Sequence, residues 1–343
     1  MDEFFSKRKH AILVTLIQEF IATAEPVGST YLVRKYDFNI SPATMRNELA
    51  KLEDMGFLFQ PYTSSGRIPT DKAYRYYVNF LMQEKLKPPM DVESTLEEFK
   101  RLEIHLQNLM EYTSKMLADL THYTSLVLAP RFKKTLFRYL RITPIEGNRL
   151  LLILMTNTGS VLNKVIPISR EISEEQLNKL TGVLNERLQG MFLEDIDIEF
   201  LQGIAGDLQE EILQHLGLLT KETVLGQESK FVYEGARHLL DLPEFQNLER
   251  LRMLFEILED EKVLAEILKN TLTSEGMKIY IGREHHHKEI EECSLITATY
   301  GIGEVPLGTI AIMGPTRMPY GRIIPVVSAC AQIFSDKLKK MAE

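Results

Sequence analysis

The chain has 343 residues, too many for one small domain, and its 44% hydrophobic and 26% charged residues are typical of a soluble globular protein. Its two cysteines, Cys293 and Cys330, are too few for a disulfide framework and are typical of a reducing cytosol. The apolar run Leu150 to Met155 is too short to cross a membrane, and the acidic start lacks the apolar core of a signal peptide. We therefore expect a cytoplasmic protein with two or three domains and no membrane partner.

The net charge of −8 is not shared evenly along the chain. Residues 1–85 contain 11 Lys and Arg and 10 Asp and Glu, a net charge of +1, which leaves 29 and 38, a net charge of −9, for the rest. Because the N-terminal part is nearly neutral, any affinity of that part for nucleic acid must come from the placement of its cations. The acidic remainder would discourage non-specific contact with DNA.

The first 40 residues predict two helices and a turn. Residues Lys7–Ala24 repeat apolar side chains at helical spacing, and Pro26 and Gly28 break this helix. A short second helix is expected over Thr30–Tyr36, with Ser29 as its cap. Residues 37–40 then form a turn.

The helix that follows has one apolar face and one polar face. Ser41 can cap it, Pro42 suits its first position, and Gly56 ends it. Its apolar positions fall at i, i+4 and i+7 and are Met45, Leu49 and Leu52. The opposite face carries small residues, hydrogen-bond donors and cations, namely Ala43, Thr44, Arg46, Asn47, Ala50 and Lys51.

A short hairpin is expected next. Residues 57–59 form a strand, residues 62–67 a turn, and Pro69 limits the returning strand. Helix, short helix, turn, polar-faced helix and hairpin is the order of a winged helix-turn-helix, with the hairpin as the wing. Taken alone, the polar face favours an ordinary solvated helix, because such faces are common. The elements that precede it favour DNA binding.

In a major groove, Arg can bond guanine, Asn can bond adenine and a Thr methyl can meet thymine, while the turn of the wing would reach phosphate or the minor groove. The expected DNA-binding residues are Ser29, Thr30, Ser41, Ala43, Thr44, Arg46, Asn47, Lys51, Ser64, Ser65, Gly66 and Arg67. We expect Arg46 to read a base and Arg67 to hold the DNA backbone.

Four segments resemble the HrcA family of heat-inducible transcription repressors of bacterial chaperone operons. They are EPVGS (25–29), SPATMRNELAKLEDMGFL (41–58), SSGRIPTDKAYRYYV (64–78) and GPTRMPY (314–320). The resemblance spans nearly the whole chain and is weakest over residues 190–270. It implies a winged helix, a GAF-like domain, and an inserted domain that dimerises.

The rest of the chain alternates helices and strands, which agrees with that organisation. The expected helices are Ser94–His122, a helix capped by Ser173 that ends near Gly190, 206–217, 248–272, and a last one from Pro325 to Lys340; the expected strands are 125–129, 137–143, 150–156, 161–168, 277–282, 295–300 and 308–313. The fold class is α+β multidomain. The predicted domains are a winged helix over 1–85, a linker over 86–93, a GAF-like domain over 94–191 and 271–343, and an inserted, mostly helical dimerising domain over 192–270.

No other motif predicts a catalytic or metal site. The tract His285–His287 with Cys293 lacks the spaced ligand pairs of structural zinc, and a solvated loop is the more plausible interpretation. In the segment 315–320, Arg317 could bind an anion, hold the inserted domain or the linker helix in place, or satisfy backbone carbonyls at a domain boundary. We see no nucleophile–base pair and no carboxylates at catalytic spacing, and therefore predict no enzyme, cofactor or metal.

The sequence thus predicts a dimeric, sequence-specific repressor that binds an inverted repeat in double-stranded DNA and acts on the nucleoid. The resemblance implies operators before chaperone operons and a chaperonin that keeps the repressor active. One alternative is a winged-helix regulator controlled by a small molecule in the GAF-like domain. Another is an enzyme that uses the winged helix for protein contacts, but it lacks a catalytic constellation.

Overall fold

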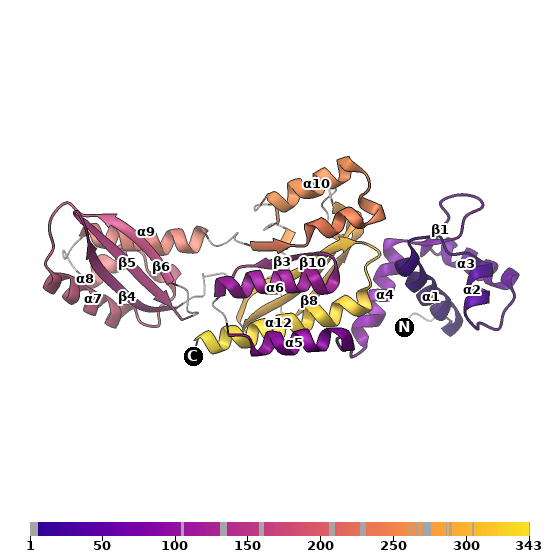
Figure 1. Ribbon diagram of the computed structural model, residues 1–343, viewed down its shortest axis with the longest axis horizontal. Helices are drawn as coiled ribbons and strands as arrows, with labels where there is room; N and C mark the ends of the chain where they lie inside the picture. The colour runs from indigo at the N-terminus through magenta and orange to yellow at the C-terminus, as the bar shows by residue number, and fades with distance from the viewer. Residues whose placement is uncertain are drawn as a thin grey trace.

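The computed structural model describes residues 6–342 apart from 104–105, 131–135, 158–160, 206–209, 227–230, 261–262, 265–266, 269–275, 286, 288–289 and 304. It is a mixed α/β protein whose elements lie in a row along the long axis (Figure 1). An N-terminal helical unit lies at one end, a five-stranded sheet in the middle, and a module with a three-stranded sheet at the other end. None of the helices in the described ranges is long and apolar enough to span a membrane.

The N-terminal unit contains the elements predicted for residues 7–69, in the predicted order, and then a further helix. They are α1 (Lys7–Thr23), α2 (Ser29–Lys35), α3 (Pro42–Asp54), β1 (Leu58–Phe59), β2 (Ile68–Pro69) and α4 (Asp71–Gln83). Ser29 was expected to cap α2, but Gly28 occupies the cap position without a side-chain hydrogen bond and Ser29 is the first helical residue.

The ends of α3 agree with the sequence prediction. The Ser41 hydroxyl accepts a hydrogen bond from the Thr44 amide at 3.1 Å, which satisfies one of the unpaired donors of the first turn. Gly56 follows the last turn with φ +77°, a left-handed conformation that glycine adopts without steric cost. The buried face consists of Met45, Leu49 and Leu52, which belong to the same hydrophobic cluster as the buried residues of α1 and α2.

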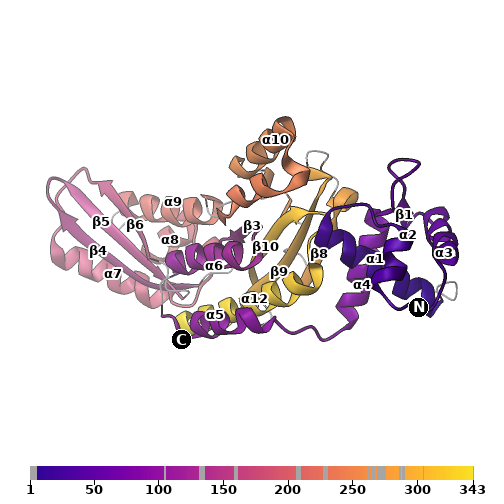
Figure 2. The same cartoon turned by 45° about the vertical axis from the view of Figure 1, so that its right-hand side comes forward.

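The central sheet has the strand order β7–β3–β10–β9–β8, and every neighbouring pair is antiparallel. Its strands are β3 (Thr124–Leu128), β7 (Phe231–Glu234), β8 (Met277–Ile281), β9 (Cys293–Ile302) and β10 (Val305–Pro315). Helices α5 (Met90–Arg101), α6 (Leu106–Thr121) and α12 (Tyr320–Ala342) cover one face, and α10 (Leu248–Glu259) lies over the other (Figure 2). Strand β10 alternates accordingly, with Ile310 and Ile312 toward α12 and Ala311 and Met313 toward α10.

The third part has its own antiparallel sheet and its own core. Strands β4 (Phe137–Ile145), β5 (Arg149–Thr156) and β6 (Val161–Pro167) pack through one face on α7 (Glu174–Leu188), α8 (Ile198–Ala205) and α9 (Glu210–Gly226). The Ser173 cap predicted for α7 is present as a capping box with Gln176. The described residues also form short 3-10 turns, which are η2 (Leu193–Asp195), η3 (Ala236–Asp241), η4 (Pro243–Phe245) and η5 (Gly282–His285).

The predicted inserted domain, 192–270, does not coincide with a hydrophobic cluster of the structure. The separate core runs from Phe137 to Leu219, whereas β7 and α10 pack with the central sheet. Strands β4–β6 were expected to lie in the same GAF-like domain as the strands near the C-terminus. They pair only with each other among the described strands, because their inward-facing Leu and Ile side chains are covered by α7–α9.

Two predicted helix boundaries were also wrong. The helix expected over 94–122 is two helices, because Leu102 is extended and its carbonyl accepts a hydrogen bond from the Lys337 ammonium of α12. Helix α12 begins at Tyr320 and not after Pro325, since the Pro319 carbonyl accepts the amides of Arg322 and Ile323 and starts the helix earlier. Parts of the helices predicted at 206–217 and 248–272 lie outside the described residues.

Candidate nucleic-acid interface

Helix α3 presents a polar face to solvent. Ala43, Arg46, Asn47 and Lys51 are exposed on it, opposite the buried Met45, Leu49 and Leu52. The Lys51 ammonium lies 2.9 Å from the Glu48 carboxylate one turn earlier, an exposed pair that solvent screens. The exposed cations and the Asn47 amide on this face are therefore accessible to a partner.

A groove runs between this helix, α2 and the loop that joins β1 to β2. Its volume is about 500 Å³, and its lining is predominantly polar. The lining residues are Val27, Gly28, Ser29, Thr30, Arg46, Leu49, Gln60, Thr63, Ser64, Ser65, Gly66 and Arg67. Seven of the twelve residues expected to bind DNA thus line one concave surface.

Hydrogen bonds within the loop keep it in one conformation. The Gln60 side-chain amide donates to the carbonyls of Thr63 and Ser65, each at 2.9 Å. The Ser65 hydroxyl donates to the Tyr62 carbonyl at 2.7 Å. Ser64 is exposed at the tip, so its hydroxyl faces solvent while the backbone beneath it is fixed.

The loop is also joined to the turn between α1 and α2. Val27 and Arg67 exchange two backbone hydrogen bonds of 2.9 Å, and Gly66 lies against this turn. A Cβ atom at Gly66 would lie 2.4 Å from the Val27 carbonyl carbon, closer than van der Waals contact allows. Glycine is therefore required at residue 66 by the approach of two backbones, which closes one end of the groove.

Arg67 was expected to hold the DNA backbone, and the structure directs its side chain inward. Its Nε lies 2.7 Å from the Glu53 carboxylate of α3, and only 16% of the side chain is exposed. Arg67 therefore ties the loop to α3. Ser41 and Thr44 are similarly engaged in the cap of α3, because their hydroxyl oxygens lie 3.0 Å apart.

A buried carboxylate that the sequence analysis did not single out joins α1 to α2. Glu19 of α1 accepts hydrogen bonds from the Tyr31 hydroxyl at 2.6 Å, the Lys35 ammonium at 2.7 Å and the Tyr36 hydroxyl. These donors, Lys35 foremost, lower the pKa of Glu19 to about 2. The sequence could have indicated this carboxylate, because Glu19 interrupts the apolar face of α1, and a charge buried there needs hydrogen-bond partners.

The first histidine of the tract does not lie in a solvated loop. His285 is buried and its Nε2 lies 3.0 Å from the Cys293 carbonyl oxygen; burial lowers its pKa. His286 lies outside the described residues. Arg317, whose role the sequence left open, bonds the Glu244 carboxylate and the Ile21 carbonyl of α1, and so joins the N-terminal unit to the central sheet.

Comparisons with known proteins relate the whole chain to one family. A family model described as the HrcA protein C-terminal domain matches residues 107–324, more than half of the chain. The heat-inducible transcription repressor HrcA of Natranaerobius thermophilus is 40% identical over 337 residues, which cover 97% of each chain. The chain belongs to the HrcA family. The HrcA of Desulforamulus reducens is 36% identical over 344 residues, 99% of this chain and 98% of that one.

A solved structure extends the comparison to the fold. A crystal structure described only as a hypothetical protein, at 2.2 Å resolution, is 25% identical, covers 98% of this chain and 99% of its own, and superposes with a TM-score of 0.70. The HrcA C-terminal model covers the two sheets but not α1–α4, whereas both HrcA relatives align over nearly the whole chain, the groove included.

Proposed function

We propose that residues 7–83 form a winged helix-turn-helix that places α3 in the major groove of an operator and so represses heat-shock genes. The observation that carries this proposal is the groove beside α3, in a member of a family of heat-inducible transcription repressors. The groove joins the middle of α3, where Arg46 is exposed, to the start of α2 and the wing in one polar surface. The wing adjoins the helix closely enough for both to contact one DNA duplex.

Within this interface, some side chains are exposed and could contact DNA, whereas others are engaged in contacts within the protein. Arg46 and Asn47 are exposed on α3 and would read base edges, and Thr30 and Ser64 are exposed around the groove and would bond phosphate. Arg67 would act indirectly by holding the wing against α3 through Glu53. Specificity would therefore depend on α3, and the wing would set its register on the backbone.

A homodimer would present two copies of α3 to an inverted repeat, since a two-fold axis in the protein matches one in the operator. The outer face of the β4–β6 sheet supports this, because the apolar side chains Tyr139, Val161 and Val165 are 43%, 54% and 49% exposed there. We infer that residues 137–226 form the inserted, dimerising domain, and that the central sheet and its helices form the GAF-like domain.

Release of DNA on heating would follow from loss of the folded repressor, and a chaperonin would restore it. The five-stranded sheet is built from segments far apart in sequence, and such folds expose aggregation-prone strands when they open. A partner that binds or rescues non-native chains shifts the folding equilibrium and hence the amount of active repressor on the nucleoid. Mild heating should then abolish DNA binding together with near-UV dichroism, and chaperonin with ATP should restore both.

The interface is tested by comparing Arg46→Ala with Arg187→Ala, which removes an exposed arginine from α7 far from the groove. Arg46→Ala should weaken binding to an inverted repeat selected by the wild type from random duplexes by about 1–3 kcal/mol and relax the preference at one base pair per half-site. Arg187→Ala should bind as the wild type does. Failure of the wild type to select any sequence, or an equal loss for Arg46→Ala on selected and random DNA, would contradict the proposal.

A further inference from the structure

The N-terminal unit meets the central sheet through an apolar contact along α4. Tyr74 of α4 and Tyr320 of α12 are both buried, with ring centroids 6.1 Å apart, and Tyr77 and Ile323 belong to the same hydrophobic cluster. Apolar burial holds two surfaces together but has little directional preference. By itself this contact would leave the unit free to turn about α4.

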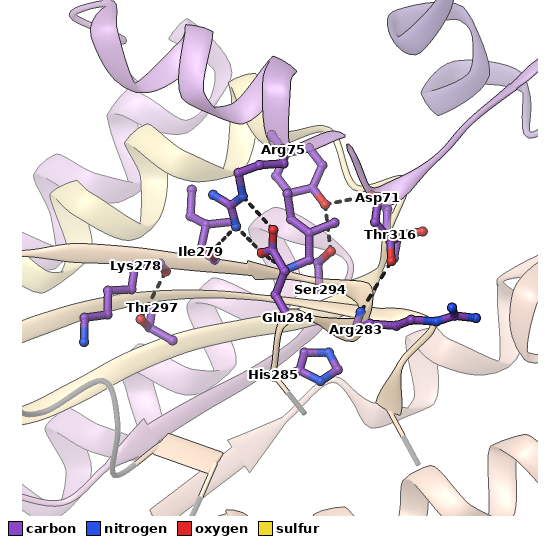
Figure 3. Close-up of polar contacts among 12 residues, drawn as sticks. Asp71, Arg75, Lys278, Ile279, Arg283, Glu284, His285, Ser294, Thr297 and Thr316 are labelled. Carbon is purple, nitrogen blue, oxygen red and sulfur yellow. Dashed lines mark hydrogen bonds and ion pairs between the residues drawn. The ribbon is translucent and has the colours of Figure 1, made fainter. Parts of the chain in front are cut away.

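An arginine of α4 adds a directional contact (Figure 3). The Arg75 Nε donates to the Glu284 carboxylate at 2.8 Å, its Nη2 donates to the other carboxylate oxygen, and the same Nη2 donates to the Ile279 carbonyl at 2.5 Å. The Ile281 amide in turn donates to Glu284 at 2.9 Å and holds this carboxylate at the end of β8. The fork of the guanidinium therefore fixes one angle between α4 and the sheet.

The first turn of α4 fits against the same corner. The Asp71 carboxylate accepts the Arg283 amide at 3.4 Å, and a Cβ atom at Gly282 would lie 2.3 Å from this carboxylate. The corner after β8 is thus shaped to admit α4 in this position.

A second arginine makes a contact from the other direction. Arg317, in the loop between β10 and α12, donates through Nη1 to the Ile21 carbonyl at 3.2 Å and through Nε and Nη2 to the two oxygens of Glu244 in η4. Ile21 lies in the last turn of α1, where helix carbonyls lack partners within the helix. Only 12% of the Arg317 side chain is exposed, so the contact is shielded from water.

We propose that Arg75 and Arg317 are positioning residues that fix the orientation of the α1–α4 unit on the central sheet, and thereby set the spacing between the two α3 helices of a dimer. This inference rests on the operator-binding dimer proposed above. Arg75 reaches from α4 of the unit to the end of β8, whereas Arg317 reaches from the loop before α12 to α1 of the unit. The two contacts therefore join different helices of the unit to different parts of the sheet domain. Together with the apolar contact, they leave no axis about which the unit turns freely.

The arrangement of the unit makes this orientation matter for DNA. Helix α4 lies next to the sheet, whereas α3 lies at the end of the unit away from it (Figures 1 and 2). A small rotation at the seam therefore moves α3 by a larger distance. A rigid dimer reads two half-sites that are separated by one helical turn, about 34–36 Å, or by a multiple of it. A dimer whose α1–α4 units could turn would no longer discriminate between different half-site spacings.

The test measures how affinity depends on the distance between half-sites. The probe is the inverted repeat that the wild type selects from random duplexes, remade with one to five base pairs added to its spacer, and a duplex with a single half-site. The variants are Arg75→Gln, Arg317→Gln and both together. Arg322→Gln is the control, because it removes another bidentate, though more exposed, arginine–carboxylate pair, with Asp91 of α5, outside the α1–α4 unit.

The wild type and Arg322→Gln should lose roughly 100-fold in affinity when five base pairs turn one half-site by half a helical turn. The double variant should bind the original repeat about tenfold more weakly, lose less than about tenfold on the longer spacer, and keep its affinity for the single half-site. The inference would be overturned if the affinity of the double variant depended on the spacer as that of the wild type does. It would also be overturned if the double variant lost as much affinity for the single half-site as for the original repeat.

The folding of the variants is checked by near-UV dichroism and by size-exclusion chromatography. If the double variant does not fold, each single variant keeps one of the two arginines and should show an intermediate spacer dependence; a wild-type dependence in both would overturn the inference. If the wild type selects no inverted repeat, the proposed function fails and not the role of the two arginines alone.

Discussion

The approach of the wing to the α1–α2 turn predicts a large effect of a single methyl group. Gly66→Ala would place a Cβ atom 2.4 Å from the Val27 carbonyl carbon and 2.6 Å from the carbonyl oxygen of Pro26. Both neighbours are backbone atoms that cannot rotate away, so the loop must move. Moving it breaks the two hydrogen bonds of 2.9 Å between Val27 and Arg67.

The expected loss can be estimated from these contacts. Overpacking by one methyl group costs roughly 1–3 kcal/mol, and each backbone hydrogen bond contributes roughly 0.5–1.5 kcal/mol. If the loop moves to relieve the clash, the cost of the broken hydrogen bonds takes the place of much of the overpacking cost, so the two costs do not simply add. We expect about 2–3 kcal/mol of local stability to be lost, a factor of roughly 30–150 in the population of the closed loop.

The loss of local stability is measured by amide hydrogen exchange at Val27 and Arg67. Its effect on DNA binding is measured with the selected inverted repeat. Gly182→Ala is the control, since a Cβ at this position in α7 meets nothing within 4 Å and alanine favours a helix. Gly66→Ala should lose protection at both amides and lose DNA affinity, and Gly182→Ala should keep both. Unchanged protection at Val27 and Arg67 in Gly66→Ala would refute the steric argument, whatever the DNA binding.

Two further substitutions test the buried contacts. Glu19→Gln should lower the free energy of unfolding by about 1–3 kcal/mol in urea titrations, because three donors lose a charged acceptor. The pKa of Glu19 falls from 4.5 to about 2 on folding, so its stabilisation is present above pH 4.5 and is lost as the pH falls toward 2; the variant should show a shallower acid dependence in that window. Leu184→Ala, at a fully buried position of α7, should cost roughly 2–5 kcal/mol and raise amide exchange in β4–β6 while leaving α1–α4 protected.

Local signals in the sequence predicted the N-terminal unit well because its determinants are short-range. Ser41 and Gly56 mark both ends of α3 through contacts within a few residues, and the apolar period of α3 gives its buried face. The strands near the C-terminus were placed for the same reason. The polar face of α3 and the turn of the wing were also predicted from composition and residue spacing alone.

Contacts between distant segments explain what the sequence did not predict. The break after α5 depends on Lys337, which is 235 residues away from Leu102. A Leu-rich strand such as β5 has the same sequence pattern whichever sheet it joins, so the sequence did not predict the separate core of residues 137–219. The inward turn of Arg67 required the position of Glu53, and nothing in the turn sequence itself indicates that partner.

The pairing of β3 with β7 has a consequence for the order of folding. Leu128 and Phe231 lie opposite each other in the central sheet, yet about 100 residues, including the whole three-stranded module, separate them in the chain. If the module were unfolded, closing this loop would cost about 4 kcal/mol of chain entropy. A folded module brings its own ends together and removes most of that cost, so β7 should add to the sheet late, after the module has formed. Until then the free edge of β3 is open to pairing with other chains, and it is such an edge that a folding helper would need to shield.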